Sequence, residues 1–147
     1  MLRKFAVSTL SAIALATSAF AASDFGTAAE AKAMLDSAIV AVKSNQAEAL
    51  TMLAKGEGGF KDRDLYPFCG GPDGNFSAHP TLTGKSLKDL KDKAGAPLGE
   101  EIYSNASEGK ISEVSYMWPR PDTTEPVQKI TYITKIGDQV CAVGYYQ

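Results

Sequence analysis

The chain contains few of the residues on which catalytic, redox and metal sites usually depend. Among its 147 residues there is one histidine, His79, and there are two cysteines, Cys69 and Cys141. The cysteines are too far apart for a CxxC redox motif or a zinc-binding pair, and there is no CxxCH haem-attachment motif. No GxSxG or HExxH motif occurs either. We therefore expect a protein that is not an enzyme, with no catalytic residue, no cofactor and no metal site.

An enzyme that uses the single histidine is the less favoured alternative. His79 with Asp73 or Asp89 would make an acid–base pair of the kind that a small hydrolase needs. No spacing in the sequence brings either carboxylate to the histidine.

An excess of positive charge is also absent. The chain has 15 lysines and arginines against 17 acidic residues, a formal net charge of −2. Binding to nucleic acid requires a basic surface that displaces phosphate counterions. We therefore expect no nucleic-acid partner.

Long apolar runs are confined to the N-terminus. Arg3 and Lys4 precede an apolar stretch over residues 5–20, and residues 19–21 supply the small-x-small cleavage pattern. This layout is typical of a secretory signal peptide, which we expect to span residues 1–21. A membrane anchor is the alternative, but a spanning helix needs roughly 20 apolar residues. The sequence thus predicts a periplasmic or secreted protein without a membrane span after cleavage.

The remaining residues predict one domain of ordinary size, over residues 24–147. Each cysteine lies in an apolar, strand-like segment of a chain expected to be exported. Two such thiols most simply form one disulfide, Cys69–Cys141, in an oxidising compartment. Two separate buried thiols are the alternative.

The start of the domain has helical periodicity. Thr27 and Glu30 form a capping-box sequence, and a second helical segment over residues 47–55 is ended by Gly56. Asn45 is expected to kink or end the first helix. Apolar residues recur at the spacing of one buried helix face: Ala31, Met34, Leu35, Ala38, Ile39 and Val42.

The remainder predicts strands and short helices. A hairpin is expected from strands at residues 65–69 and 75–79 around a glycine-rich turn, with short helices opened by Ser86 and near Pro97. Three more strands are expected, at residues 111–118, 127–136 and 139–146. The order of elements predicts an α+β domain with an antiparallel sheet.

Several strings resemble consecutive segments of a single Cache domain, the PAS-like extracytoplasmic sensor family. They are DRDLYPF, GGPDGNFSAHP, LTGKSLKDLKDKAGAP, YMWPRP, KITYITKI and VCAVGYY, and together they cover nearly all of the domain. The resemblance implies a PAS-like five-stranded antiparallel sheet with a long N-terminal helix and short helices over one face. It also implies that a small molecule, commonly a small carboxylate, binds between the sheet and the short helices.

By this resemblance the chain would act as a periplasmic sensor for a small organic acid or similar metabolite. It would then present the ligand to a membrane receptor or kinase. A structural or interaction protein with a filled pocket is the other alternative. The helical arm is compatible with packing on its own sheet or against a second copy in a homodimer.

The candidate ligand-binding residues are Tyr116, Trp118, Lys129, Tyr132 and His79. Tyr116 and Trp118 share a strand face, where they line a pocket or fill the core. Lys129, on what we take to be an edge strand, either supplies the counter-charge of a carboxylate or is solvated. Tyr132 lies three positions after Lys129, so a regular strand points the two side chains to opposite faces. Both line the pocket only if a β-bulge lies between them. His79 either contacts the ligand or caps the hairpin through backbone hydrogen bonds.

Two charged groups near these residues complete the prediction. Arg120 is a second candidate cation, although its place between two prolines suggests a loop. Asp62 and Asp64 flank Arg63, a pattern that favours a surface ion-pair cluster over a metal site.

Overall fold

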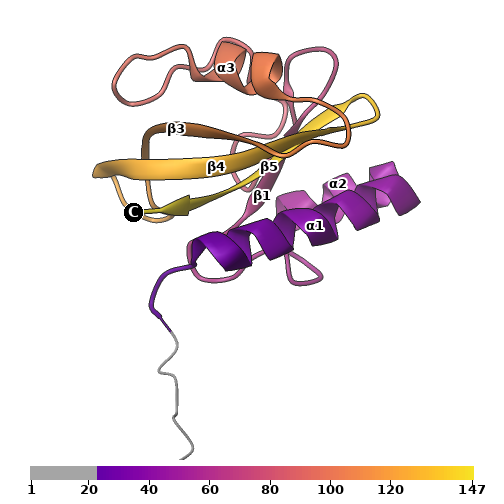
Figure 1. The fold of residues 1–147 in the computed structure, drawn as a ribbon, viewed down its shortest axis with the longest axis horizontal. Helices are drawn as coiled ribbons and strands as arrows, with labels where there is room; N and C mark the ends of the chain where they lie inside the picture. Colours follow the sequence, from indigo (N-terminus) through magenta and orange to yellow (C-terminus); the bar gives the residue numbers. More distant parts are fainter. Residues whose placement is uncertain (1–22) are drawn as a thin grey trace, which may run out of the picture.

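The computed structural model describes residues 23–147, so the predicted signal peptide lies outside the described residues. The elements are α1 (Ala28–Ser44), α2 (Gln46–Lys55), β1 (Pro67–Gly70), β2 (Phe76–Ala78), α3 (Leu98–Asn105), β3 (Ser112–Pro119), β4 (Pro126–Ile136) and β5 (Gln139–Tyr146). Helices α1 and α2 cover one face of the sheet, and α3 lies over the other (Figure 1). No helix in the described part of the chain is long and apolar enough to cross a membrane.

The five strands form one antiparallel sheet in the order β2-β1-β5-β4-β3. This confirms the predicted α+β architecture with its long N-terminal helix. One expectation about the sheet is wrong. Strand β4, which carries Lys129, is paired on both sides and is not an edge strand.

Local hydrogen bonds explain the boundaries of the two N-terminal helices. The Thr27 hydroxyl accepts from the backbone N–H of Glu30, whose carboxylate accepts from the Thr27 N–H, and this capping box starts α1. Asn45 ends α1, and its side chain then caps α2. Gly56 ends α2 in the left-handed conformation that glycine adopts without strain.

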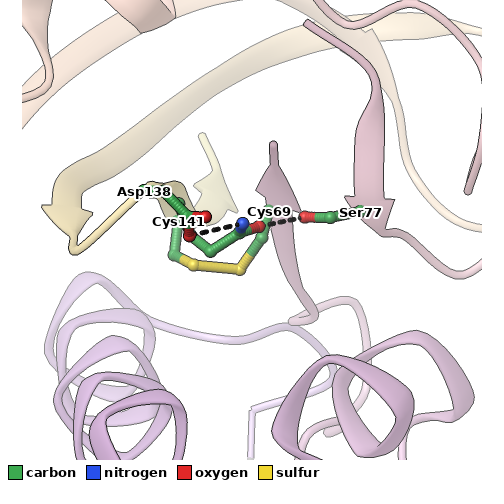
Figure 2. The surroundings of a disulfide bond; sticks show 5 residues. Cys69, Ser77, Asp138 and Cys141 are labelled. Carbon is green, nitrogen blue, oxygen red and sulfur yellow. Dashed lines mark hydrogen bonds between the residues drawn. A yellow bond between two sulfur atoms is a disulfide. The ribbon is translucent and has the colours of Figure 1, made fainter. Parts of the chain in front are cut away.

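The disulfide joins the central strand β5 to its neighbour β1 on the face that α1 covers. Cys69 and Cys141 are directly opposite in the β1–β5 register, with their Cα atoms 4.1 Å apart. Figure 2 shows the bridge above the two helices, beside the hydrogen bond from Ser77 to Gln139. Both cysteines are fully buried among apolar residues of α1 and α2. The predicted bridge is therefore present.

The short helix predicted from Ser86 does not form, and residues 80–97 are turns and bends. Ser86 does accept from the Asp89 N–H, as a helix cap would. The N–H groups that would extend the helix, however, bond elsewhere: Asp92 donates to the Ala96 carbonyl, and Lys93 donates to the Met117 carbonyl on β3. These bonds thus take the donors that a helix would need.

Helix α3 lies directly on this segment. The Gly99 N–H donates to the Leu90 carbonyl, and a Cβ at position 99 would overlap the carbonyl oxygen of Leu87. The Tyr103 hydroxyl donates to the carbonyl of Gly71, 2.8 Å away. These contacts hold α3 and residues 80–97 together as a cover over one face of the sheet.

Candidate functional site

A small cavity lies between the sheet and this cover. Its volume is about 10 Å³, which is room for about one water molecule. The lining side chains are mostly apolar or aromatic: Tyr66, Phe68, Phe76, His79, Leu87, Leu90, Leu98, Ile102, Tyr116 and Trp118.

A larger groove of about 480 Å³ adjoins the cavity. Tyr66, His79 and Trp118 line both spaces, so these three side chains form the boundary between them. The groove runs between the end of α2 with the loop after it and the turn that follows β3. The two spaces together make the candidate ligand site.

His79, at the end of β2, is held by its own loop. Its Nδ1 accepts from the N–H groups of Thr81 (3.0 Å) and Leu82 (3.1 Å), which leaves the ring proton on Nε2. Nε2 has no acceptor among residues 23–147, and no buried side-chain polar atom in that part of the chain lacks a partner. The Nε2–H is therefore open to the cavity or groove.

The environment also keeps this ring neutral. Burial, and next the charge of Lys129, lower the pKa of His79 to about 4. The side chain thus caps the hairpin and in addition presents one neutral donor to the cavity. Its capping contacts come from backbone, and the structure does not place Asp73 or Asp89 on it: these carboxylates bond Asn75 and Ser86.

Lys129 is buried beneath a layer of tyrosines, with 1 % of its surface exposed. Its Nζ donates to the Tyr66 hydroxyl at 3.0 Å and lies 4.9 Å from the centre of the Tyr146 ring. Cross-strand pairing puts Tyr116 and Tyr146 on either side of it, on the α3 face. Lys129 does not line the cavity itself, because Tyr66 stands between them.

Lys129 nevertheless acts on the cavity through Tyr66. Burial by itself lowers the pKa of Lys129, but the neighbouring phenols, Tyr116 first and then Tyr66, outweigh it and raise the pKa above its ordinary value. The Tyr66 and Tyr146 rings, with centres 4.2 and 4.9 Å from Nζ, favour the ammonium form in the same direction. A hydroxyl that accepts from an ammonium is polarised and donates more strongly, so Tyr66 carries the effect of the buried charge to the cavity.

Tyr116 and Trp118 line the cavity from β3. Their rings meet edge to face at 6.3 Å, and the Tyr116 hydroxyl accepts from Thr131 at 3.0 Å. Tyr116 is buried, whereas Trp118 is partly exposed and borders the groove. Trp118 is thus the side chain at the mouth of the cavity.

Tyr132 lies on the opposite face of the sheet. β4 pairs regularly with both neighbours, so no bulge brings Tyr132 to the side of Lys129. Its ring packs against Tyr145, 5.9 Å away, in the cluster under α1. The structure therefore brings His79, Tyr116 and Trp118 to the cavity, places Lys129 behind it, and leaves Tyr132 outside.

Two residues that matter here received no role from the sequence. Tyr66 transmits the charge of Lys129, and nothing in its local pattern distinguishes it from a core tyrosine. Gly144 gives Lys129 its space, because a Cβ there would overlap Lys129 and Thr131. A glycine inside an apolar strand is a sign of close approach, so this position could have been found.

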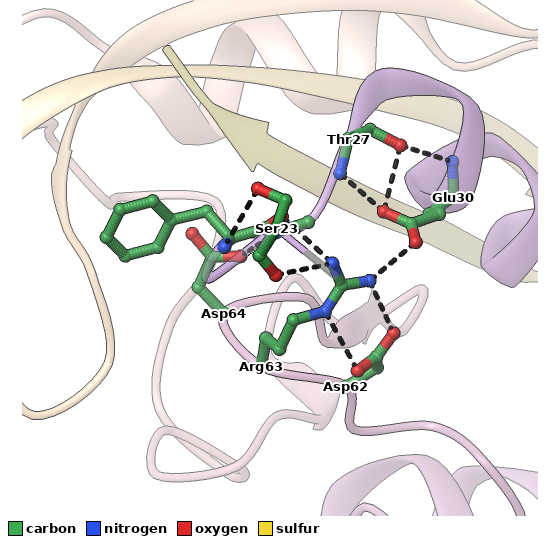
Figure 3. Close-up of polar contacts among 8 residues, drawn as sticks. Ser23, Thr27, Glu30, Asp62, Arg63 and Asp64 are labelled. Carbon is green, nitrogen blue, oxygen red and sulfur yellow. Dashed lines mark hydrogen bonds and ion pairs between the residues drawn. The ribbon is translucent and has the colours of Figure 1, made fainter. Parts of the chain in front are cut away.

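The predicted ion-pair cluster is divided in two by the fold. Figure 3 shows Arg63 bound to Asp62 and Glu30 and to backbone carbonyls of the segment before α1. Asp64 is instead buried, accepts from the Gly26 N–H and pairs with Arg120 at 3.2 Å. Among residues 23–147, no three histidine, cysteine or acidic side chains are grouped in a way that could hold a metal ion.

The comparisons with known proteins agree with this architecture. A family model described as a Cache domain matches residues 29–145. Over 56 residues the chain is 34 % identical to the methyl-accepting chemotaxis protein McpP of Pseudomonas putida, which is 38 % of this chain but 10 % of that protein. The chain therefore spans only a small part of the curated relative that it matches.

Two solved structures share the fold. One is a Cache chemosensory domain studied for carboxylic acid recognition, with a TM-score of 0.55 and 22 % identity, over 79 % of this chain and 85 % of that one. The other is the periplasmic sensor domain of a chemotaxis protein, with a TM-score of 0.59 and 23 % identity, over 79 % and 87 % of the two chains. With the family model matching most of its length, the chain belongs to the Cache domain family.

Proposed function

We propose that this protein is an extracytoplasmic sensor domain that binds a small organic acid in the cavity beneath Trp118. The bound state would be presented to a membrane signalling partner. The observation that carries the proposal is the His79 Nε2–H, which has no acceptor among residues 23–147, beside a Tyr66 hydroxyl that accepts from the buried Lys129. Membership of the Cache family and the similarity to chemosensory domains support the same function.

The chemistry of the two donors fits a carboxylate. A carboxylate that leaves water must receive hydrogen bonds that compensate for its lost hydration. Here a neutral imidazole and a polarised phenol supply the donors, and the Lys129 ammonium supplies the opposite charge one residue behind them. The apolar remainder of the cavity suits a short hydrocarbon chain.

The size of the cavity sets the size of the ligand. About 10 Å³ holds a water molecule but no organic acid, so binding requires Trp118 and residues 80–97 to move outward. A ligand of two or three carbon atoms needs the least movement. We therefore expect acetate and propionate to bind better than longer monocarboxylates.

Thermal unfolding and calorimetry with propionate test the proposal, with propylamine as the control of opposite charge. At 100 times Kd a ligand stabilises the fold by about 2.7 kcal/mol. Lys129→Met removes the charge behind Tyr66 and should weaken binding about tenfold, which corresponds to about 1.4 kcal/mol. Lys135→Met is the matched control, because Lys135 is exposed on the same strand.

A second variant separates the two roles of His79. His79→Asn keeps an acceptor for the N–H groups of Thr81 and Leu82 but removes the Nε2–H. Binding should fall while the fold is retained. If no short carboxylate binds, or if Lys129→Met and Lys135→Met bind equally well, the proposed site is wrong.

The closed cavity also favours one other function. A domain whose pocket is filled by its own aromatic side chains would act as a structural or interaction protein. In that case no small carboxylate would raise the melting temperature, and Trp118→Ala would only destabilise the fold. The same thermal-shift measurements therefore distinguish the two functions.

A further inference from the structure

The groove outside the cavity is lined by five basic side chains and one acidic one. The basic residues are Lys55, Lys61, Arg63, Lys93 and Arg120, and the acidic one is Asp122. The protein as a whole has more acidic than basic residues. A concentration of cations around one concave space is therefore a local feature of this groove.

Not all of these charges are available to a ligand. Arg63 uses its guanidinium on Asp62, Glu30 and two backbone carbonyls (Figure 3). Arg120 uses Nε on Asp64, and its terminal nitrogens have no acceptor among residues 23–147.

The three lysines are the least engaged. Within the described part of the chain, Lys55, Lys61 and Lys93 have no acidic side chain within ion-pair distance. They therefore remain able to bind an anion in the groove.

Lys93 lies beside Trp118, at the mouth of the cavity. Its Nζ lies 5.2 Å from the centre of the Trp118 ring, and its backbone N–H donates to the Met117 carbonyl on β3. Arg120, two residues after Trp118, also lines the groove, with its guanidinium carbon 4.1 Å from the centre of the Phe25 ring. A molecule that extends outward past Trp118 would meet Lys93 and Arg120 first.

We propose that the physiological ligand carries a second anionic group, which binds in the groove at Lys93 and Arg120. This rests on the proposed function, since the first carboxylate is bound at His79 and Tyr66. The cavity is too small for the whole molecule, whereas the groove of about 480 Å³ has the volume of an ordinary ligand site. The second group is a carboxylate or a phosphonate-like group, because an ammonium on a flexible stem binds either.

Propionate, succinate and 3-phosphonopropionate make a matched series, since the last two add one anionic group to the first. We expect both dianions, or one of them, to bind about tenfold more tightly than propionate at low salt. Because the groove is open to solvent, the preference should shrink between about 20 mM and about 200 mM salt. Calorimetry measures the three dissociation constants and their ratio.

Lys93→Gln is the decisive variant, and Lys91→Gln is its control. Both lysines are exposed and lie two residues apart in the same segment, but only Lys93 lines the groove. Lys93→Gln should reduce the preference for dianions over propionate several-fold, with the propionate affinity of the same variant as the reference. Lys91→Gln should change neither value.

The outcomes separate this inference from the proposed function. If propionate binds and neither dianion binds more tightly, the second anion site is overturned and the sensor function stands. An equal loss of propionate and dianion affinity in Lys93→Gln also overturns it. If none of the three ligands binds, both proposals fail. A selective gain that Lys93→Gln removes and Lys91→Gln retains supports the site.

Discussion

The two faces of the sheet are built from different kinds of residue. Under α1 and α2 the packing is almost entirely apolar and is joined by the buried disulfide. Under α3 and residues 80–97 the packing includes a buried ammonium, a neutral imidazole and buried hydroxyls around a cavity. Within residues 23–147, the polar side chains buried on the first face are all hydrogen-bonded, whereas on the second face the His79 Nε2–H has no acceptor.

This difference indicates a division of labour within one small domain. Apolar burial and a disulfide stabilise the helical face, and neither requires a buried charge. Burying Lys129 costs desolvation free energy. The contacts with the tyrosines offset this cost but add no net stability. We infer that the helical face maintains the fold and that the α3 face is kept polar for binding. Four changes, from the largest expected effect to the smallest, test that inference.

Removal of the disulfide should have the largest effect. The double variant Cys69→Ala, Cys141→Ala opens a cross-link between residues 72 positions apart. The chain-entropy relation for a loop of that length predicts a loss of about 4 kcal/mol of unfolding free energy. Urea denaturation measures the loss.

The affinity of the folded protein for propionate should not change, because both cysteines lie on the other face of the sheet. Reducing agent added to the wild-type protein should reproduce the loss of stability. A double variant with altered ligand affinity would show that the helical face also shapes the site.

Acid should destabilise the α3 face through His79. Its pKa is about 4 in the folded protein against 6.5 in an unfolded chain, so between these values the unfolded state binds more protons. Stability should therefore be complete above pH 6.5 and should fall by about 3 kcal/mol as the pH drops towards 4. Denaturation over this pH range, compared between wild type and His79→Asn, isolates the contribution of the histidine.

The comparison with His79→Asn is needed because carboxylates also titrate at low pH. Glu30 has its pKa lowered to about 2, first by Arg63, and contributes mainly below this range. If wild type and His79→Asn lose stability in parallel, the imidazole is not buried in its neutral form.

The two faces also differ in how far the sequence predicts them. The helical face follows from local rules: the capping box at Thr27, the cap at Asn45 and the apolar period of α1 all form as expected. Strand β5, at Gln139–Tyr146, matches its predicted range at both ends. Short-range patterns suffice where short-range bonds decide the structure.

The α3 face depends on long-range contacts, and there the sequence predicts less. The sequence predicts a helix from Ser86 because the bond from the Lys93 N–H to the distant Met117 carbonyl cannot be seen in the local pattern. The local pattern around Lys129 suits an edge strand, although the middle of three consecutive antiparallel strands is interior. The role of Tyr66 depends on a contact with Lys129 across 63 residues.

Thr27→Ala should have a smaller effect, confined to the helical face. It removes the side-chain cap of α1 and should cost about 1 kcal/mol of unfolding free energy. Thr51→Ala is the control, because Thr51 is exposed within α2 and bonds only the carbonyl of Ala47. Denaturation of the two variants gives the difference, and ligand affinity should be unchanged in both. Equal losses would mean that the capping box does not stabilise α1.

Lys129→Met should have the smallest effect on stability, although Lys129 is one of the most buried residues. Methionine has a similar length, carries no charge whose burial costs free energy, and fits beside Gly144. The free energy of unfolding should therefore change by no more than about 1 kcal/mol in either direction. If Lys129→Met leaves the stability unchanged and weakens ligand binding, the role of Lys129 is to supply charge to the site. If the variant instead loses several kcal/mol, the tyrosine cluster needs the ammonium to fold, and the polar face is structural after all.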